Sequence, residues 1–273
     1  PSSGKTVFLS VFANTFSSRD DSDFWLEPMD NKTAEFVHKN MLTLKNRSWP
    51  RLTEAGLCYD LDWDLHYKNN RAIFRSFDVN GETWRRFVDL YGDRHKKNPS
   101  PDQMKNAPVH LKKVVDSLQK SVCIIALMDI KKIIDGPCEY IDTHSSLALI
   151  QFLEHHRKLD RLAFIIPKID KLKSYYSECN NSWASVIKKF SPHTYQYIQD
   201  KKIPFFPISA VQDQELSENN KWVPKPNFKS EGLHPLMKHI ANKIEKNNKG
   251  FFRSLFRITT YILFITATRP PRF

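Results

Sequence analysis

The first six residues, PSSGKT, combine the residue types that bind phosphate. Backbone N–H groups around Ser2, Ser3 and Gly4 can close on a phosphate, the Lys5 ammonium meets its charge, and the Thr6 hydroxyl is a ligand for Mg²⁺. The run matches the second half of G-x-x-x-x-G-K-[ST], so we expect the chain to begin inside its own phosphate-binding loop. A plain helix-capping turn explains the same letters, and this alternative stays open.

A second group of residues has the composition of a metal and γ-phosphate site. Asp78 ends a predicted strand, where its carboxylate can hold Mg²⁺ through water, and Gly81 can offer its N–H to a γ-phosphate. Thr53, upstream of this strand, has a hydroxyl that can close over both. A strand-exit turn and an ordinary loop threonine are the alternatives.

A third group has the residue types that recognise a base. Lys168 and Asp170 follow the buried run LAFIIP, and a carboxylate there can accept two hydrogen bonds from guanine N1 and N2 while the Lys stem lies along the ring. Ser209 and Ala210 end the next predicted strand and can brace the base through backbone N–H groups. A solvated Lys/Asp turn is the alternative for the first pair.

The elements that must position these groups are strands and helices in alternation. Three apolar runs read as buried strands, Ser121–Met128, Leu162–Pro167 and Ile203–Ser209, and helical spacing returns between and after them, at 147–159 and 236–244. This order predicts an α/β fold with a mostly parallel sheet and helices on both faces.

A hairpin is predicted upstream of those strands. Apolar and polar residues alternate from Leu57 to Tyr67, and a second strand covers 71–79, which together indicate an antiparallel hairpin at the edge of the sheet. The apolar spacing after Thr6 predicts a helix. We expect the residues upstream of Pro1 to supply the strand between 71–79 and 121–128, and therefore a gap or distortion there.

Taken in order, these motifs resemble the TRAFAC-clade P-loop GTPases, over roughly residues 1 to 245. Within that clade, PSSGKT, the W-P-x-x-T segment ending at Thr53 and a Glu after DxxG look most like the bacterial double-GTPase proteins of conflict and defence systems. The resemblance implies a Ras-like sheet that binds GTP or GDP with Mg²⁺ and acts as a molecular switch.

The resemblance also assigns roles, and the chain departs from the family at three positions. Pro167 replaces the usual Asn or Thr before Lys168, and Val211 replaces the Lys after Ser-Ala, which weakens the expectation of guanine specificity. Glu82 stands where many members carry a water-orienting Gln, so hydrolysis is expected to be slow or partner-dependent. Arg51 is a candidate arginine finger in cis, against the alternative of a solvated loop Arg.

Composition sets the remaining expectations. Lys and Arg exceed Asp and Glu by 42 − 30 = 12, but the basic residues are spread out, so we expect solvated faces and no nucleic-acid partner. The four cysteines have no metal-ligand spacing and fit a reducing, cytoplasmic compartment, with Cys58 and Cys123 as small hydrophobes in strands. A protein effector or a second GTPase domain is the expected partner.

We expect two regions. Residues 1–248 form the GTPase-like domain without its first strand, and 249–273 form an apolar tail or helix, compatible with membrane contact although its uncharged run is short for a span. Two other functions stay open. One is a nucleotide-binding scaffold or pseudo-GTPase acting through partner contacts, and the other is an ATPase of related architecture.

Overall fold

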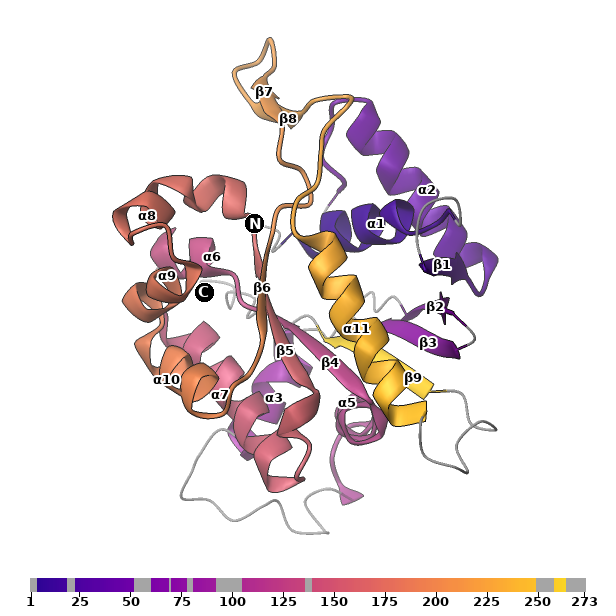
Figure 1. The fold of residues 1–273 in the computed structure, drawn as a ribbon, viewed down its shortest axis with the longest axis vertical. Coiled ribbons are helices and arrows are strands. Elements are labelled where there is room, and N and C mark those ends of the chain that lie inside the picture. The colour runs from indigo at the N-terminus through magenta and orange to yellow at the C-terminus, as the bar shows by residue number, and fades with distance from the viewer. Residues whose placement is uncertain are drawn as a thin grey trace.

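Buried strands alternate with amphipathic helices along most of the chain, and they assemble into a mixed α/β fold (Figure 1). The computed structural model describes residues 4–18, 23–51, 60–68, 70–77, 81–91, 105–135, 139–248 and 258–263. The described strands are β1 (Phe24–Pro28), β2 (Asp60–Tyr67), β3 (Asn70–Phe77), β4 (Cys123–Leu127), β5 (Leu162–Pro167), β6 (Phe205–Ile208), β7 (Gln214–Leu216), β8 (Trp222–Pro224) and β9 (Ile258–Leu263).

Helices connect and cover these strands. The described ones are α1 (Lys5–Thr15), α2 (Asn31–Lys45), α3 (Gly81–Tyr91), α5 (Val109–Lys120), α6 (Ile130–Asp135), α7 (Glu139–His155), α8 (Lys173–Glu178), α9 (Trp183–Phe190), α10 (Pro192–Asp200) and α11 (Leu233–Asn248), with short 3₁₀ turns at Leu159–Arg161 and Ile169–Leu172. The predicted alternation of strands and helices is confirmed, and element ends differ from the prediction by a few residues.

Within the described residues, the main sheet has seven strands in the order β1-β2-β3-β9-β4-β5-β6. From β3 to β6 neighbouring strands are parallel, while β1-β2-β3 are antiparallel. The carboxyl ends of β3, β9, β4, β5 and β6 therefore lie at one edge of the sheet. The segments that follow these strands are thereby brought together.

Two expectations about the sheet were wrong. The position between β3 and β4 holds no gap, because Ile258–Leu263 fills it as β9, parallel to both neighbours. The same observation corrects the expected helix or free tail at 249–273 for these six residues. The β2 strand is also not the edge, since Phe24–Pro28 pairs with it as β1. Glu27 and Pro28 interrupt the apolar run of this short strand, so its sequence does not show the alternation typical of a β-strand.

The strands of the parallel region divide their side chains between two cores. Cys123, Ile125 and Leu127 of β4 face a cluster built with α1 and α11, whereas Ile124 and Ala126 face a cluster built with α5, α7, α9 and α10. Successive residues of a strand point to opposite faces, so a strand that is apolar throughout needs helices on both sides. As expected, Cys123 acts as a small buried hydrophobe, and burial raises the pKa of its thiol to about 12.

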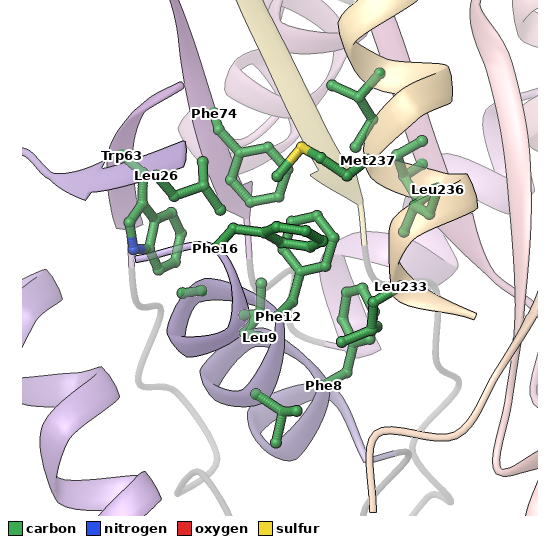
Figure 2. Packing of buried hydrophobic residues seen from close by; sticks show 14 of the residues in the cluster. Phe8, Leu9, Phe12, Phe16, Leu26, Trp63, Phe74, Leu233, Leu236 and Met237 are labelled. Atoms are coloured by element: carbon green, nitrogen blue, oxygen red, sulfur yellow. The ribbon is translucent and has the colours of Figure 1, made fainter. Parts of the chain in front are cut away.

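Helix α1 is held to the sheet by a column of aromatic rings. Phe8, Phe12 and Phe16 recur at four-residue intervals, so they share one helix face, with ring centroids 5.4 and 5.1 Å apart along the column. Phe12 also stacks on Phe74 of β3, and the group packs against α11 (Figure 2). Truncating a buried Phe of this kind costs about 3–5 kcal/mol. The start of α1, with Gly4 as its N-cap, is thus held against the sheet.

The place of β9 in the sheet gives the first testable prediction. In a strand with neighbours on both sides, each N–H bonds to one neighbour or the other, so Tyr261→Pro removes a hydrogen bond and introduces a steric clash. We expect a loss of roughly 3 kcal/mol or more in the free energy of unfolding, measured in urea. Tyr261→Val keeps the N–H and is the control. Equal urea midpoints for the proline variant and the unchanged chain would contradict the position of β9.

A second prediction concerns His239 on α11, whose ring lies 5.2 Å from that of Phe206. Burial, with Lys243 and Lys246 nearby, lowers the pKa of His239 to about 4. The folded state thus favours the neutral ring. Its contribution to stability is fully present above about pH 6.5 and is lost as the pH falls through the window from 6.5 to about 4.

His239→Gln should therefore flatten the fall in stability across that window, by roughly 1–2 kcal/mol after solvent screening is allowed for. The check is the free energy of unfolding measured at intervals from pH 4 to 7.5. His193→Gln, at an exposed position, is the matched control and should leave the pH profile unchanged. Parallel profiles for all three proteins would argue against a buried neutral His239.

Candidate functional site

Four segments that are far apart in the sequence meet at the carboxyl edge of the parallel strands. Asp129 follows β4, Lys168 and Asp170 follow β5, and Ser209 follows β6. Gly4, at the start of α1, lies beside Lys168. This edge is where open α/β sheets bind their ligands, because strand ends and helix starts surround it.

Gly4 has a backbone that suits a phosphate-binding turn. Its φ of 76° and ψ of 10° are left-handed, a conformation that glycine adopts without strain. The helical ladder of α1 begins with Phe8 N–H donating to Gly4 O at 2.8 Å, so the ladder does not use the N–H groups of Thr6 and Val7. The N-cap residue, Gly4, has no side chain with which to cap this helix start. The first turn of α1 therefore presents backbone donors and the positive end of a helix dipole.

The Lys168 side chain lies between the turn at Gly4 and the buried Asp129 carboxylate. A Cβ added at Gly4 would lie 3.5 Å from Lys168 Cε, so the lysine stem runs along the backbone of the turn. Its Nζ lies 2.8 Å from Oδ2 of Asp129, whose side chain is only 2% exposed. Such a buried carboxylate needs a cationic partner. The ion pair thus ties the segments after β4 and β5 together beside Gly4.

Asp170 is held in place from the neighbouring strand. The Ser209 hydroxyl donates to Asp170 Oδ1 at 2.7 Å, and the Gln214 amide donates to Oδ2 at 3.1 Å. Ser209 is itself fully buried. Its backbone is held in place by two hydrogen bonds with Glu231: the Ser209 N–H donates to Glu231 O, and the Ser209 carbonyl accepts from the Glu231 N–H. The carboxylate that the sequence assigned to base recognition therefore has a defined orientation. The Ala210 N–H remains as the candidate backbone donor to a base.

The structure brings together some of the predicted site residues and leaves others apart. Gly4, Lys5, Thr6, Lys168, Asp170, Ser209 and Ala210 lie at the edge described above. Arg51 is exposed and makes no hydrogen bond or ion pair with a described residue of this edge. Gly81 begins α3, with Glu82 in its first turn. Ser2, Ser3, Thr53 and Asp78, like the side chain of Glu82, fall outside the described residues.

Two residues of the site were not predicted from the sequence. Asp129 could have been found, since it is a carboxylate directly after a buried strand, at the position where α/β sites carry polar residues. Gln214 had no comparable signal, because it reaches Asp170 from a hairpin that no motif marks.

This arrangement suits a nucleotide. The left-handed Gly4 and the start of α1 suit phosphate oxygens, and the acceptor-only Asp170 suits a base with two adjacent N–H groups. Thr6 is the described candidate for a metal ligand. Among the described residues no cluster of three His, Cys, Asp or Glu side chains could hold a metal ion. The Mg²⁺ ligands expected at Thr53 and Asp78 thus remain predictions.

The chain was compared with known proteins in three ways. No protein-family model, no curated protein and no solved structure matches it. In the part of the chain that the structure describes, no helix combines the length and the apolar character needed to cross a membrane.

The ion pair between Lys168 and Asp129 gives the next prediction. Lys168→Met leaves a buried carboxylate without this cation, so we expect a loss of roughly 2–4 kcal/mol in the free energy of unfolding. The double variant with Asp129→Asn should recover part of the loss, since the amide carries no charge. Lys173→Met, at an exposed lysine of α8, is the control. Urea unfolding of these proteins and of the Asp129→Asn single variant is the measurement, and additive effects of the two site substitutions would contradict the pairing.

Proposed function

We propose that this chain is a Ras-like P-loop nucleotide-binding protein that binds and hydrolyses nucleoside triphosphates with Mg²⁺, GTP being favoured, and works as a switch. The observation that carries the proposal is the meeting of Gly4, Lys168 and Asp170 at one sheet edge, with Ser209 fixing the carboxylate. These residues were selected as phosphate-binding and base-reading from separate sequence motifs. Their proximity supports a single ligand that carries both a phosphate and a base.

Phosphate binding is assigned to the start of α1. Backbone N–H groups of the first turn donate to phosphate oxygens, and Lys5 supplies a positive charge next to them. The Thr6 hydroxyl is a ligand for Mg²⁺, and this ion would neutralise charge on the phosphates when bound. The chain's own contribution to hydrolysis is positioning and charge stabilisation, without a covalent nucleophile.

Base selection is assigned to Asp170. Both carboxylate oxygens accept hydrogen bonds, so the group fits guanine, which has adjacent N1–H and N2–H donors, and does not fit adenine, which presents an acceptor at N1. The Lys168 stem, held along Gly4 and anchored on Asp129, supplies a flat apolar surface for the ring.

Pro167 lacks the side-chain amide that the family's Asn supplies, and it ends β5 in register with Ile208. In this chain Asp170 is instead oriented by the Ser209 hydroxyl, which donates to its Oδ1. The departure at Pro167 is therefore compatible with guanine binding. Glu82 and Arg51 stay proposed contributors to hydrolysis, and we expect hydrolysis to be slow.

A second candidate is a scaffold or pseudo-GTPase that keeps the fold in degenerate form and works through partner contacts. It is favoured by the low exposure of the Asp170 side chain, 10%, since a base must displace a neighbour to reach it. The resemblance to bacterial double-GTPase proteins points to an effector or a second GTPase domain as partner for either candidate. An ATPase of related architecture is distinguished by nucleotide competition.

The test of the proposed function is binding of a fluorescent GTP analogue to the 273-residue chain with Mg²⁺, competed by GTP, ATP and xanthosine triphosphate. We expect GTP to compete and ATP to fail. Lys5→Ala should weaken binding roughly 10- to 100-fold by removing a charge-assisted contact. Lys45→Ala, at an exposed lysine of α2, is the matched control.

Asp170→Asn makes the test specific for the base. An amide offers one acceptor and one donor, which matches the N1–H and C2 carbonyl of xanthine and mismatches guanine. We expect preference to move from GTP to xanthosine triphosphate by roughly 10- to 100-fold, while the exposed control Asp160→Asn keeps the preference for GTP. Displacement by ATP would reassign Asp170 to a structural role. Absence of binding by any nucleotide would favour the scaffold.

A further inference from the structure

The small hairpin formed by β7 and β8 extends away from the main sheet but returns to the base-reading residue (Figure 1). Gln214, the first residue of β7, places its amide nitrogen 3.1 Å from Asp170 Oδ2. The amide oxygen accepts a 2.7 Å hydrogen bond from Lys171 Nζ. One side chain of the hairpin thus contacts the carboxylate that the proposed function assigns to guanine.

Gln214 covers the accessible side of that carboxylate. The Ser209 hydroxyl holds Oδ1 from a fully buried position, so Oδ2 is the oxygen on which the amide lies. With Gln214 in place the Asp170 side chain is only 10% exposed. A planar base therefore reaches Asp170 only when the Gln214 side chain moves away.

The hydrogen bond from Gln214 to Asp170 is of the same kind as the one that a guanine base would make with this carboxylate. The amide N–H of Gln214 donates to a carboxylate oxygen, as the N–H groups of guanine would. We propose that Gln214 is an intramolecular latch that occupies the base-reading carboxylate until a guanine nucleotide displaces it. This inference rests on the proposed function and adds a residue that sets guanine affinity.

The latch is held in position by contacts between the hairpin and other elements. Glu215, next to Gln214, pairs with Arg47 at 2.9 Å, just beyond the end of α2. On the other strand, the carbonyl of Trp222 accepts a 2.7 Å hydrogen bond from the Trp49 indole, and Lys171 Nζ lies 5.3 Å from the Trp222 ring. These contacts fix the backbone on which Gln214 is mounted. Opening the latch therefore needs a rotation of the Gln214 side chain, which also gives up the hydrogen bonds of its amide with Lys171 Nζ and Val211 O.

Removing the competing donor should strengthen guanine binding. We expect Gln214→Leu to lower the Kd for GTP by roughly 5- to 50-fold, the worth of one hydrogen bond to a charged group. The Kd for ATP should not change. Gln212→Leu is the matched control, because its amide pairs with the exposed Glu231 and does not touch Asp170. Thermal unfolding of each variant checks that it is folded.

A second variant tests whether the Lys171 ammonium replaces the Gln214 amide as the donor to Asp170. Lys171 Nζ lies 4.0 Å from Asp170 Oδ2 and can take the place of the lost amide, so Gln214→Leu is also combined with Lys171→Met. Tighter GTP binding by either Gln214 variant, with the Gln212 control unchanged, supports the latch. GTP binding that depends on Asp170 but is unchanged or weaker in both Gln214 variants overturns the latch and leaves the proposed function standing. Absence of nucleotide binding by every protein overturns both.

Discussion

The ion pair between Lys168 and Asp129 is the interaction on which the candidate site depends. A carboxylate as buried as Asp129 is costly unless a cation meets it, and Lys168 is the residue after β5 that does so. In satisfying this requirement, the lysine stem is laid against Gly4 at the start of α1. One electrostatic constraint therefore fixes the relative positions of three segments, those after β4 and β5 and before α1.

The parallel sheet supplies the frame for that interaction. Since β3, β9, β4, β5 and β6 run in one direction, the residues after them gather at a single edge, and the aromatic column of α1 holds the turn at Gly4 there. The order of the strands, with β9 from the far end of the described chain inserted between β3 and β4, keeps this edge continuous. The site thus depends on long-range pairing more than on any local motif.

Under the proposed function, the separate contacts on the two oxygens of Asp170 would connect base recognition with its control. Ser209 orients the carboxylate permanently, because its own backbone is paired with Glu231, whereas Gln214 is mounted on a hairpin outside the main sheet. A base-reading residue that is oriented from one side and covered from the other can bind its ligand selectively and still resist binding. Affinity in such a site is set by the covering residue as much as by the reading residue.

The sequence by its local patterns predicted the alternation of strands and helices, and it marked Gly4, Lys168, Asp170 and Ser209 as candidate site residues, which the structure brings to one edge of the sheet. Local patterns suffice for these, because a buried strand is apolar throughout and a polar residue directly after it is conspicuous. Strand pairing in the folded chain was needed to show that Ile258–Leu263 is a central strand and that Phe24–Pro28 forms the edge, and side-chain contacts were needed to place Gln214 beside Asp170. These depend on strand pairing and side-chain contacts between distant segments, which leave no periodicity in the sequence to detect.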